Sequence, residues 1–250
     1  MFAVVALLLA TAIWLPVVHL FFQPPAGAMP SKAGAISPLA RSLAARHLQL
    51  WENPEARAKE IARMRSTNAE WDFMGRTYLV LALTNMALRE PDQSARYLQV
   101  VDAIIDETLT LDREKGLYFF LMDYARRGNF EAQPARSTFL DGEIALMLAS
   151  RQLVEAKPAY VPLLRERIDL LVRYLSQSPS FNGESYPNEC WMFCNAIAAT
   201  AVRISDQVDD RDHSTFLQRW LAATKAKLLD PKTGLLVSSF KLRGIFQQAT

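Results

Sequence analysis

The sequence predicts an all-α fold built from helical hairpins, and three observations predict it. From Ser37 onward, apolar residues recur every three to four positions, which is the period of an amphipathic helix. No segment shows the sustained alternation of apolar and polar residues that a half-buried strand requires. A turn sequence, Leu-Asp-x3-Gly-Leu, also occurs twice, each time after an amphipathic helix. Recurring hairpins and turns predict an α/α toroid or solenoid.

Caps and prolines set the expected helix boundaries. Ser37-Pro38 and Asn53-Pro54 each combine a capping side chain with a proline suited to the first helical position. Asn68 can cap a third helix. Eight helices are expected, over residues 38–51, 54–65, 69–90, 92–111, 138–154, 160–175, 189–205 and 212–229.

The two turn sequences, residues 111–117 and 229–235, follow the second and fourth of the resulting hairpins. Their glycines suit a left-handed position that closes the turn, and their aspartates can accept bonds from the turn amides. Chance similarity between two common turns is the alternative explanation. Six hairpins, as in an (α/α)6 barrel, would need roughly 300 residues. With about four hairpins present, we expect either an open array or an incomplete toroid.

An apolar segment precedes the helical domain. Residues 1–22 contain no Asp, Glu, Lys or Arg, and about 20 apolar residues are enough to cross a bilayer. We expect a transmembrane helix at 1–22, a linker at 23–36 and an incomplete α/α-toroid domain at 37–250. A secretory signal, with a cleavage pattern at residues 26–28, and a buried core helix are the alternatives.

Basic residues follow the apolar segment, whereas none precedes it. Lys32, Arg41 and Arg46 are the first charged side chains of the chain. The positive-inside rule therefore favours a cytoplasmic position for the domain. The expected localisation is that of a single-pass membrane protein.

Composition excludes several classes of protein. The chain is 50% hydrophobic and 22% charged, which excludes a wholly disordered or collagen-like chain. A net charge of +2 gives no basic surface for nucleic acid. Two cysteines are too few for a disulfide scaffold, and three scattered histidines favour no zinc site. There is no phosphate-binding glycine loop, so we expect neither a metal nor a cofactor.

The segment 185–195 contains both cysteines of the chain. Cys190 and Cys194 are four residues apart and would share one side of the helix expected at 189–205. A helix start lowers the pKa of a thiol, which favours a reactive thiolate. The alternative is that both are small core residues, as buried free cysteines usually are.

Two other segments place carboxylates in the first turns of a helix. Asp72 lies in one of them, and Asp141 and Glu143 lie in the other. Each carboxylate either lies at a helix N-terminus, where the helix dipole stabilises its charge, or is a partly desolvated general acid or base. Tyr78 can donate or relay a proton, and its alternative is an ordinary core aromatic.

The spacing of Asp72 and Tyr78, together with the string Pro-Asn…Cys-Asn at residues 187–195, resembles the linalool dehydratase/isomerase family. Members of that family are cofactor-free (α/α)6 barrels that add, remove or shift water on a small terpene alcohol. The resemblance implies that Asp72 and Tyr78 contribute to acid/base catalysis. It also implies that Cys194 corresponds to the second of two family cysteines, nine residues apart. Ser185 stands at the position of the first.

The sequence therefore predicts a membrane-anchored lyase or isomerase acting on a small apolar alcohol. Its expected partners are this substrate and the membrane, without nucleic acid, and self-association is left open. The expected catalytic residues are Asp72, Tyr78 and Cys194, and the expected substrate-binding residues are Ser185, Cys190, Trp191, Asp141 and Glu143.

Two functions of other classes compete with this prediction. The first is a carbohydrate-active toroid enzyme that pairs Asp72 with Asp141 or Glu143, since glycoside hydrolysis uses two nearby carboxyl groups. The second is a non-catalytic helical-repeat module that binds a partner on a concave face.

Overall fold

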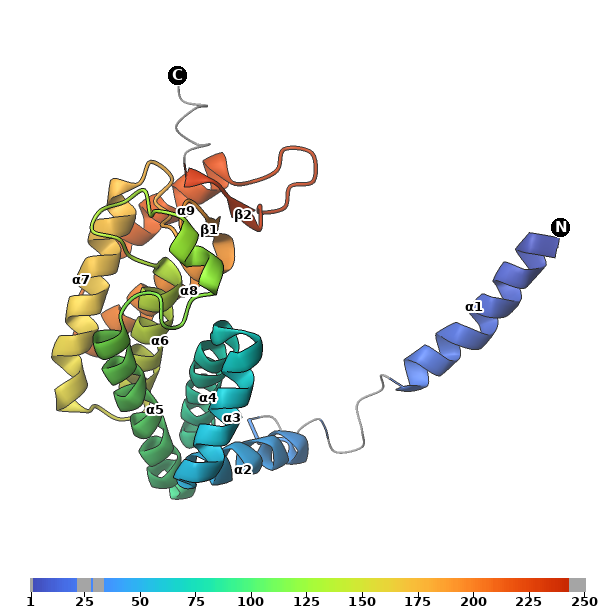
Figure 1. Ribbon diagram of the computed structural model, residues 1–250, viewed down its shortest axis with the longest axis horizontal. Coiled ribbons are helices and arrows are strands. Elements are labelled where there is room, and N and C mark those ends of the chain that lie inside the picture. Colours follow the sequence, from blue (N-terminus) through green and yellow to red (C-terminus); the bar gives the residue numbers. More distant parts are fainter. Residues whose placement is uncertain (1, 22–27, 29–33, 243–250) are drawn as a thin grey trace. The chain divides into compact units, whose positions relative to one another are not determined.

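A computed structural model describes residues 2–21, 28 and 34–242, except for the side chain of His19 (Figure 1). The chain divides into two compact units, Met1–Arg46 and His47–Thr250. In the first unit, α1 covers Phe2–Phe21, and α2 (Pro38–Glu52) begins here and continues into the second unit. The hydroxyl of Ser37 accepts a hydrogen bond from the backbone N–H of Ala40 at 3.1 Å and thereby caps α2.

The predicted membrane localisation is wrong. A membrane span needs about 20 consecutive, mainly apolar helical residues. The prediction rested on the composition of the run 1–22 alone, whereas no helix among the described residues is long and apolar enough to cross a membrane. The orientation inferred from the basic residues depended on that span and is withdrawn with it. The linker predicted at 23–36 lies largely outside the described residues.

The described part of the His47–Thr250 unit is helical almost throughout, which confirms the predicted all-α class. Two strands of two residues each, β1 (Cys190–Trp191) and β2 (Ser239–Phe240), pair antiparallel. Three short 3-10 helices are η1 (Pro91–Gln93), η2 (Asp123–Arg127) and η3 (Pro158–Tyr160). The α-helices after α2 are α3 (Pro54–Thr67), α4 (Ala69–Arg89), α5 (Ser94–Lys115), α6 (Thr138–Val154), α7 (Val161–Gln177), α8 (Met192–Asp209) and α9 (Ser214–Lys227).

Local sequence explains most of these boundaries. The side chain of Asn53 accepts from the N–H of Ala56 at 3.0 Å, and that of Asn68 accepts from the N–H of Glu70 at 2.8 Å. Both satisfy amides that a helix start leaves unpaired. Most predicted helices therefore begin and end within a few residues of the observed ones.

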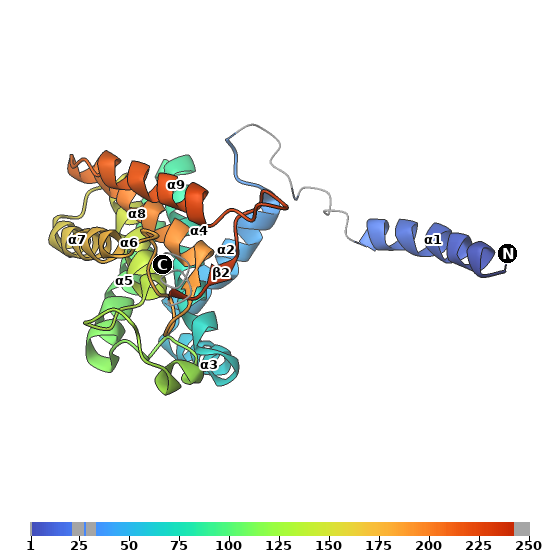
Figure 2. The same ribbon diagram turned by 90° about the horizontal axis from the view of Figure 1, so that it is seen from above.

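The helices of this unit form an inner and an outer set. The inner helices α4, α6 and α8 pack side by side, while α5 and α7 cover the junctions between them. In both views α6 lies between α4 and α7 (Figures 1 and 2). Every residue from Thr138 to Gln152 is buried, so α6 is the centre of the core.

The predicted helix at 189–205 begins later than expected. Asn188 adopts a left-handed backbone conformation with φ of 57°, and Cys190 and Trp191 continue as β1. The partner strand, β2, comes from a part of the chain about 50 residues later. The expected helix therefore starts only at Met192, because strand pairing competes with the helix at Cys190 and Trp191.

The two turn sequences behave differently. Gly116 and Gly234 both have positive φ angles, 76° and 69°, as the prediction required. The carboxylate of Asp230 accepts from the N–H groups of Lys232 and Thr233 at 2.9 and 2.8 Å, also as predicted. Asp112 instead binds an arginine of α7. The repeat therefore reflects similar turn geometry and not a common aspartate role.

Candidate active site

The start of α4 and the start of α8 border a cavity of about 410 Å³, which we call the aromatic cavity. Its wall is mainly apolar, with one carboxylate, one thiol and one serine hydroxyl among the polar side chains. The lining residues are Asn68, Glu70, Trp71, Met74, Met122, Tyr124, Phe139, Ser185, Tyr186, Trp191, Phe193 and Cys194.

Tyrosine hydroxyls donate hydrogen bonds to Glu70, in the wall of the aromatic cavity, and to Glu189, outside it. The hydroxyl of Tyr186 donates to Oε1 of Glu70 and accepts the backbone N–H of Met122 at 2.9 Å. The ring of Tyr186 stacks on Tyr124, with ring centroids 4.9 Å apart, and the hydroxyl of Tyr124 donates to Glu189 at 3.1 Å. Residues from α4, η2 and the loop before β1 are thereby joined around one wall.

Cys194 lines the aromatic cavity in the first turn of α8. Burial raises the pKa of its thiol to about 12, while a hydrogen bond with the Ser185 hydroxyl lowers it and nearby Glu143 raises it further. The helix start was expected to favour a thiolate, but desolvation outweighs the dipole. Cys194 is therefore a neutral thiol and a weak acid at pH 7, so it can pass on a proton only by taking up another.

Glu143, on α6, is the most unusual acid near the aromatic cavity. Its side chain is 1% exposed, and its Oε1 has no hydrogen-bond partner among the described residues. Burial raises the pKa of Glu143 to about 7, although a hydrogen bond with the Thr77 hydroxyl lowers it. Such a carboxyl can gain or lose a proton near neutral pH, as an acid/base catalyst must.

Tyr78 lies next to this acid and is 53% exposed. Partial burial raises the pKa of its phenol, and the nearby Glu143 and Cys194 raise it further. The structure thus brings together four of the predicted site residues, which are Tyr78, Glu143, Ser185 and Cys194.

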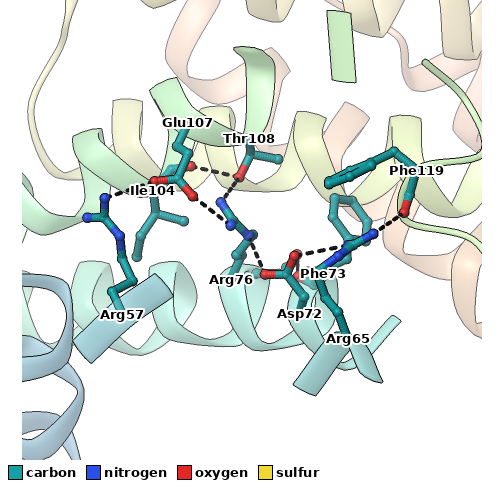
Figure 3. A network of polar contacts seen from close by, with 10 residues as sticks. Arg57, Arg65, Asp72, Phe73, Arg76, Ile104, Glu107, Thr108 and Phe119 are labelled. Atoms are coloured by element: carbon teal, nitrogen blue, oxygen red, sulfur yellow. Dashed lines mark hydrogen bonds and ion pairs between the residues drawn. The ribbon is translucent and has the colours of Figure 1, made fainter. Parts of the chain in front are cut away.

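Asp72 belongs to a separate network of arginines (Figure 3). Its carboxylate, 1% exposed, accepts from Nε of Arg76 at 2.7 Å and from Nη1 of Arg65 at 3.2 Å. Arg76 also donates to Glu107 at 2.7 Å, and Glu107 forms an ion pair with Arg57 at 3.2 Å. Two guanidinium groups thus bind the carboxyl group of Asp72, and it does not line the aromatic cavity.

Asp141 likewise faces away from the aromatic cavity. It accepts from Nε of Arg136 at 2.8 Å and from Arg167, which also donates to Asp112 at 2.9 Å. These residues border a second, polar cavity of about 250 Å³. Asp141 and Glu143, two positions apart, therefore lie on opposite sides of α6, since two helical steps turn through about 200°.

The two remaining predicted residues lie on β1. Cys190 is fully buried, and burial raises the pKa of its thiol well above the usual range. Trp191 lines the aromatic cavity, and its Nε1 donates to Glu189 at 3.3 Å. Cys190 is thus a core residue beside the site, whereas Trp191 forms part of its wall.

Sequence reasoning missed Glu70 and Thr77, although helical geometry pointed to them. Glu70, Thr77 and Tyr78 lie on one face of α4, and Asp72 lies on the opposite face. The selection of Asp72 from this segment overlooked that its neighbour Glu70 faces the same way as Tyr78.

Glu184 is a second missed residue. Its fully buried carboxylate accepts from the N–H groups of Glu131 at 3.0 Å, Ala132 at 3.1 Å and Asn188 at 2.6 Å. These bonds fix the loop that presents Ser185. No local pattern predicts this role, because Glu131 and Ala132 lie more than 50 residues earlier in the chain.

Comparison with known proteins leaves this site without an assigned chemistry. No protein-family model matches the chain, and no curated protein matches its sequence. Within the described residues, no group of three or more His, Cys, Asp or Glu side chains could hold a metal ion.

Proposed function

We propose that this protein carries out acid/base hydration, dehydration or isomerisation of a small apolar alcohol, as its resemblance to the linalool dehydratase/isomerase family implies. One observation carries the proposal: Glu143, a buried carboxyl whose pKa burial raises to about 7, lies close to the thiol of Cys194, which lines an apolar cavity. The chemistry requires no electron transfer and is therefore proposed without a cofactor.

In the proposed dehydration, Glu143 supplies a proton through the thiol of Cys194 to the substrate hydroxyl. The carbon–oxygen bond breaks and water leaves. The carboxylate of Glu70 then takes a proton from the carbon next to the one that lost the hydroxyl group. The electron pair of that carbon–hydrogen bond forms the double bond. Hydration reverses these steps, and loss followed by re-addition of water at another carbon gives isomerisation. Ser185 orients the thiol, and Tyr78 stabilises Glu143.

This assignment differs from the one that the resemblance implies for Asp72. The carboxylate oxygens of Asp72 accept hydrogen bonds from both Arg65 and Arg76, and Asp72 does not line the aromatic cavity. Glu143 has the opposite environment, and we therefore assign the proton transfer to Glu143 and a positioning role to Asp72.

We also propose that the domain is an α/α toroid of the (α/α)6 type. The alternation of inner helices (α4, α6, α8) with outer helices (α5, α7) along the chain supports this arrangement. In such a fold, inner helices present side chains to a central pocket. Glu143 on α6 and Cys194 on α8 fit that expectation.

The carbohydrate-active alternative has weaker support. It requires a protonated acid beside a carboxylate, but Asp72 and Asp141 each bind two arginines. Glu143, by contrast, has a pKa that burial raises to about 7.

The test is turnover of a panel of small terpene alcohols by the purified chain without added cofactor, followed by gas chromatography. Glu143→Gln keeps the shape of the side chain but cannot supply a proton. We expect it to lower kcat by about 10²–10⁴-fold, the usual contribution of general acid/base catalysis. Glu114→Gln, on the exposed side of α5, is the matched control and should retain the wild-type rate.

Two results would overturn the proposal. If no alcohol of the panel is converted by folded protein, the non-catalytic binding module becomes the better explanation. If Glu143→Gln turns over substrate at the wild-type rate while Asp72→Asn abolishes turnover without loss of stability, the proton donor is Asp72.

A further inference from the structure

The aromatic cavity contains more aromatic side chains than acid/base chemistry uses. They come from α4, η2, α6, the loop before β1, β1 and α8, so they gather only in the folded unit. Several are substantially exposed, led by Trp71 at 58%. The six are Trp71, Tyr124, Phe139, Tyr186, Trp191 and Phe193.

The charge of the aromatic cavity is one-sided. Glu70 is acidic, and none of the described residues that line the cavity is Lys, Arg or His. Outside this wall, Glu189 accepts from the hydroxyl of Tyr124 and from the indole of Trp191. Its other oxygen forms an ion pair at 3.9 Å with Lys241, an exposed residue that does not line the cavity. A ring whose edge donates to a carboxylate keeps an electron-rich face, and such faces attract cations.

The aromatic rings elsewhere in this unit provide a contrast. Arg65 lies over Phe119 at 3.8 Å, Lys157 over Tyr160 at 4.0 Å, and Arg219 over Phe181 at 4.7 Å. Among the described residues, no lysine or arginine lies over a ring of the aromatic cavity in this way. Cations of the described residues thus lie over several rings elsewhere in the unit, but over none of the six rings of this cavity.

We propose that the aromatic cavity binds a small organic cation whose charge is surrounded by methyl or methylene groups, such as a quaternary ammonium. Aromatic faces and Met74 and Met122 contact the apolar groups of such a ligand, and Glu70 offsets its charge. A compact hydrated cation gains less, because it would lose its water to mainly apolar walls. Binding of this ligand requires no turnover and does not depend on the proposed reaction.

The experiment compares two probes of nearly the same shape, choline and 3,3-dimethylbutan-1-ol, which differ in having a charged nitrogen or a neutral carbon at the branch point. Binding to the full chain is measured by isothermal titration calorimetry and by quenching of tryptophan fluorescence. We expect choline to bind at least about tenfold more tightly than the neutral alcohol, in line with a desolvated cation–π contact.

Two variants locate the binding. Glu70→Gln retains an acceptor for the Tyr186 hydroxyl, and it should weaken choline binding about tenfold while leaving the neutral alcohol unaffected. Trp71→Leu changes an exposed residue, and it should weaken the binding of choline more than the binding of the neutral alcohol. Glu114→Gln should change the affinity for neither probe. Circular dichroism shows whether each variant is folded.

Equal affinity for both probes, or no binding of choline at millimolar concentration, would overturn the inference. Choline binding that both variants leave unchanged would overturn it as well, since the cation would then bind elsewhere. These outcomes are separate from those for the proposed function. A chain that converts alcohols without preferring choline loses this inference alone, and one that binds choline without converting any alcohol loses the function alone.

Discussion

Glu143 and Asp72 have almost the same low exposure, yet their surroundings give them opposite chemistry. Asp72 accepts from two arginines, which stabilise its charge. Glu143 has an Oε1 without a partner among the described residues, and burial raises its pKa more than the Thr77 hydroxyl lowers it. Burial alone therefore does not identify a proton donor among single residues. The groups that contact each carboxyl distinguish Glu143 from Asp72.

The raised pKa of Glu143 predicts a pH-dependent stability. The carboxyl has a pKa of about 7 in the folded protein against an ordinary value of 4.5, so the folded state binds the proton more tightly. Its contribution is fully present below the unfolded pKa and is lost as pH rises through about 7. Between about pH 5 and pH 8, Glu143→Gln should gain about 1–3 kcal/mol in free energy of unfolding relative to wild type. Urea unfolding at several pH values measures it.

The control for this prediction is Glu114→Gln, whose stability should follow the wild-type pH profile because Glu114 is exposed. A Glu143→Gln profile parallel to that of wild type would show that Glu143 does not titrate in this range.

At the scale of elements, the close approach of α6 and α8 sets the site, because α6 carries Glu143 and α8 carries Cys194. Gly142 makes this approach possible. A Cβ atom added there would lie 3.2 Å from the backbone of Ala198, whereas one added at Gly75 in α4 would meet only the end of Met64 at 4.0 Å.

Opposite effects of the same substitution at these two glycines are therefore expected. Gly75→Ala should stabilise the protein by about 0.5–1 kcal/mol, since alanine favours a helix and has room there. Gly142→Ala should destabilise it by about 1–3 kcal/mol, since two packed helices must separate. Thermal or urea unfolding of both variants measures the difference. Equal gains at both positions would mean that α6 and α8 can move apart without cost.

At the scale of the whole His47–Thr250 unit, the Asp72 network ties together helices that the sequence separates. Arg57 and Arg65 come from α3, Asp72 and Arg76 from α4, and Glu107 from α5 (Figure 3). The guanidinium of Arg65 also donates to the backbone oxygen of Phe119, in the segment after α5, at 2.8 Å.

Removing Asp72 should therefore lower the stability of the unit. Asp72→Ala removes one of the two counter-ions that lie 2.7 Å from Arg76, which is 2% exposed, and leaves Glu107 alone. Loss of one partner from such a buried pair costs about 3–5 kcal/mol, which should be visible in urea unfolding.

The exposed pair of Arg96 and Glu52, at 2.8 Å, provides the control. Glu52→Ala should give no measurable change, because solvent screens an exposed pair. An Asp72→Ala protein as stable as wild type would show that the network does not support the fold, and the positioning role of Asp72 would then be wrong.

The local sequence determined the helices, their caps at Asn53 and Asn68, and the left-handed turns at Gly116 and Gly234. Each of these depends on residues within a few positions of one another, so local spacing suffices to predict them. The sequence also singled out Tyr78, Glu143, Ser185 and Cys194, but with no means of ranking them above Asp72 and Asp141.

Only the tertiary structure decided that ranking. The partners that hold Asp72 and Asp141 include arginines from other helices, and the burial that raises the pKa of Glu143 depends on how α4, α6 and α8 pack. The strand that replaces the expected start of α8 depends likewise on Ser239 and Phe240, far along the chain. Charge and burial at a site arise from the sum of such long-range contacts, which local periodicity does not encode.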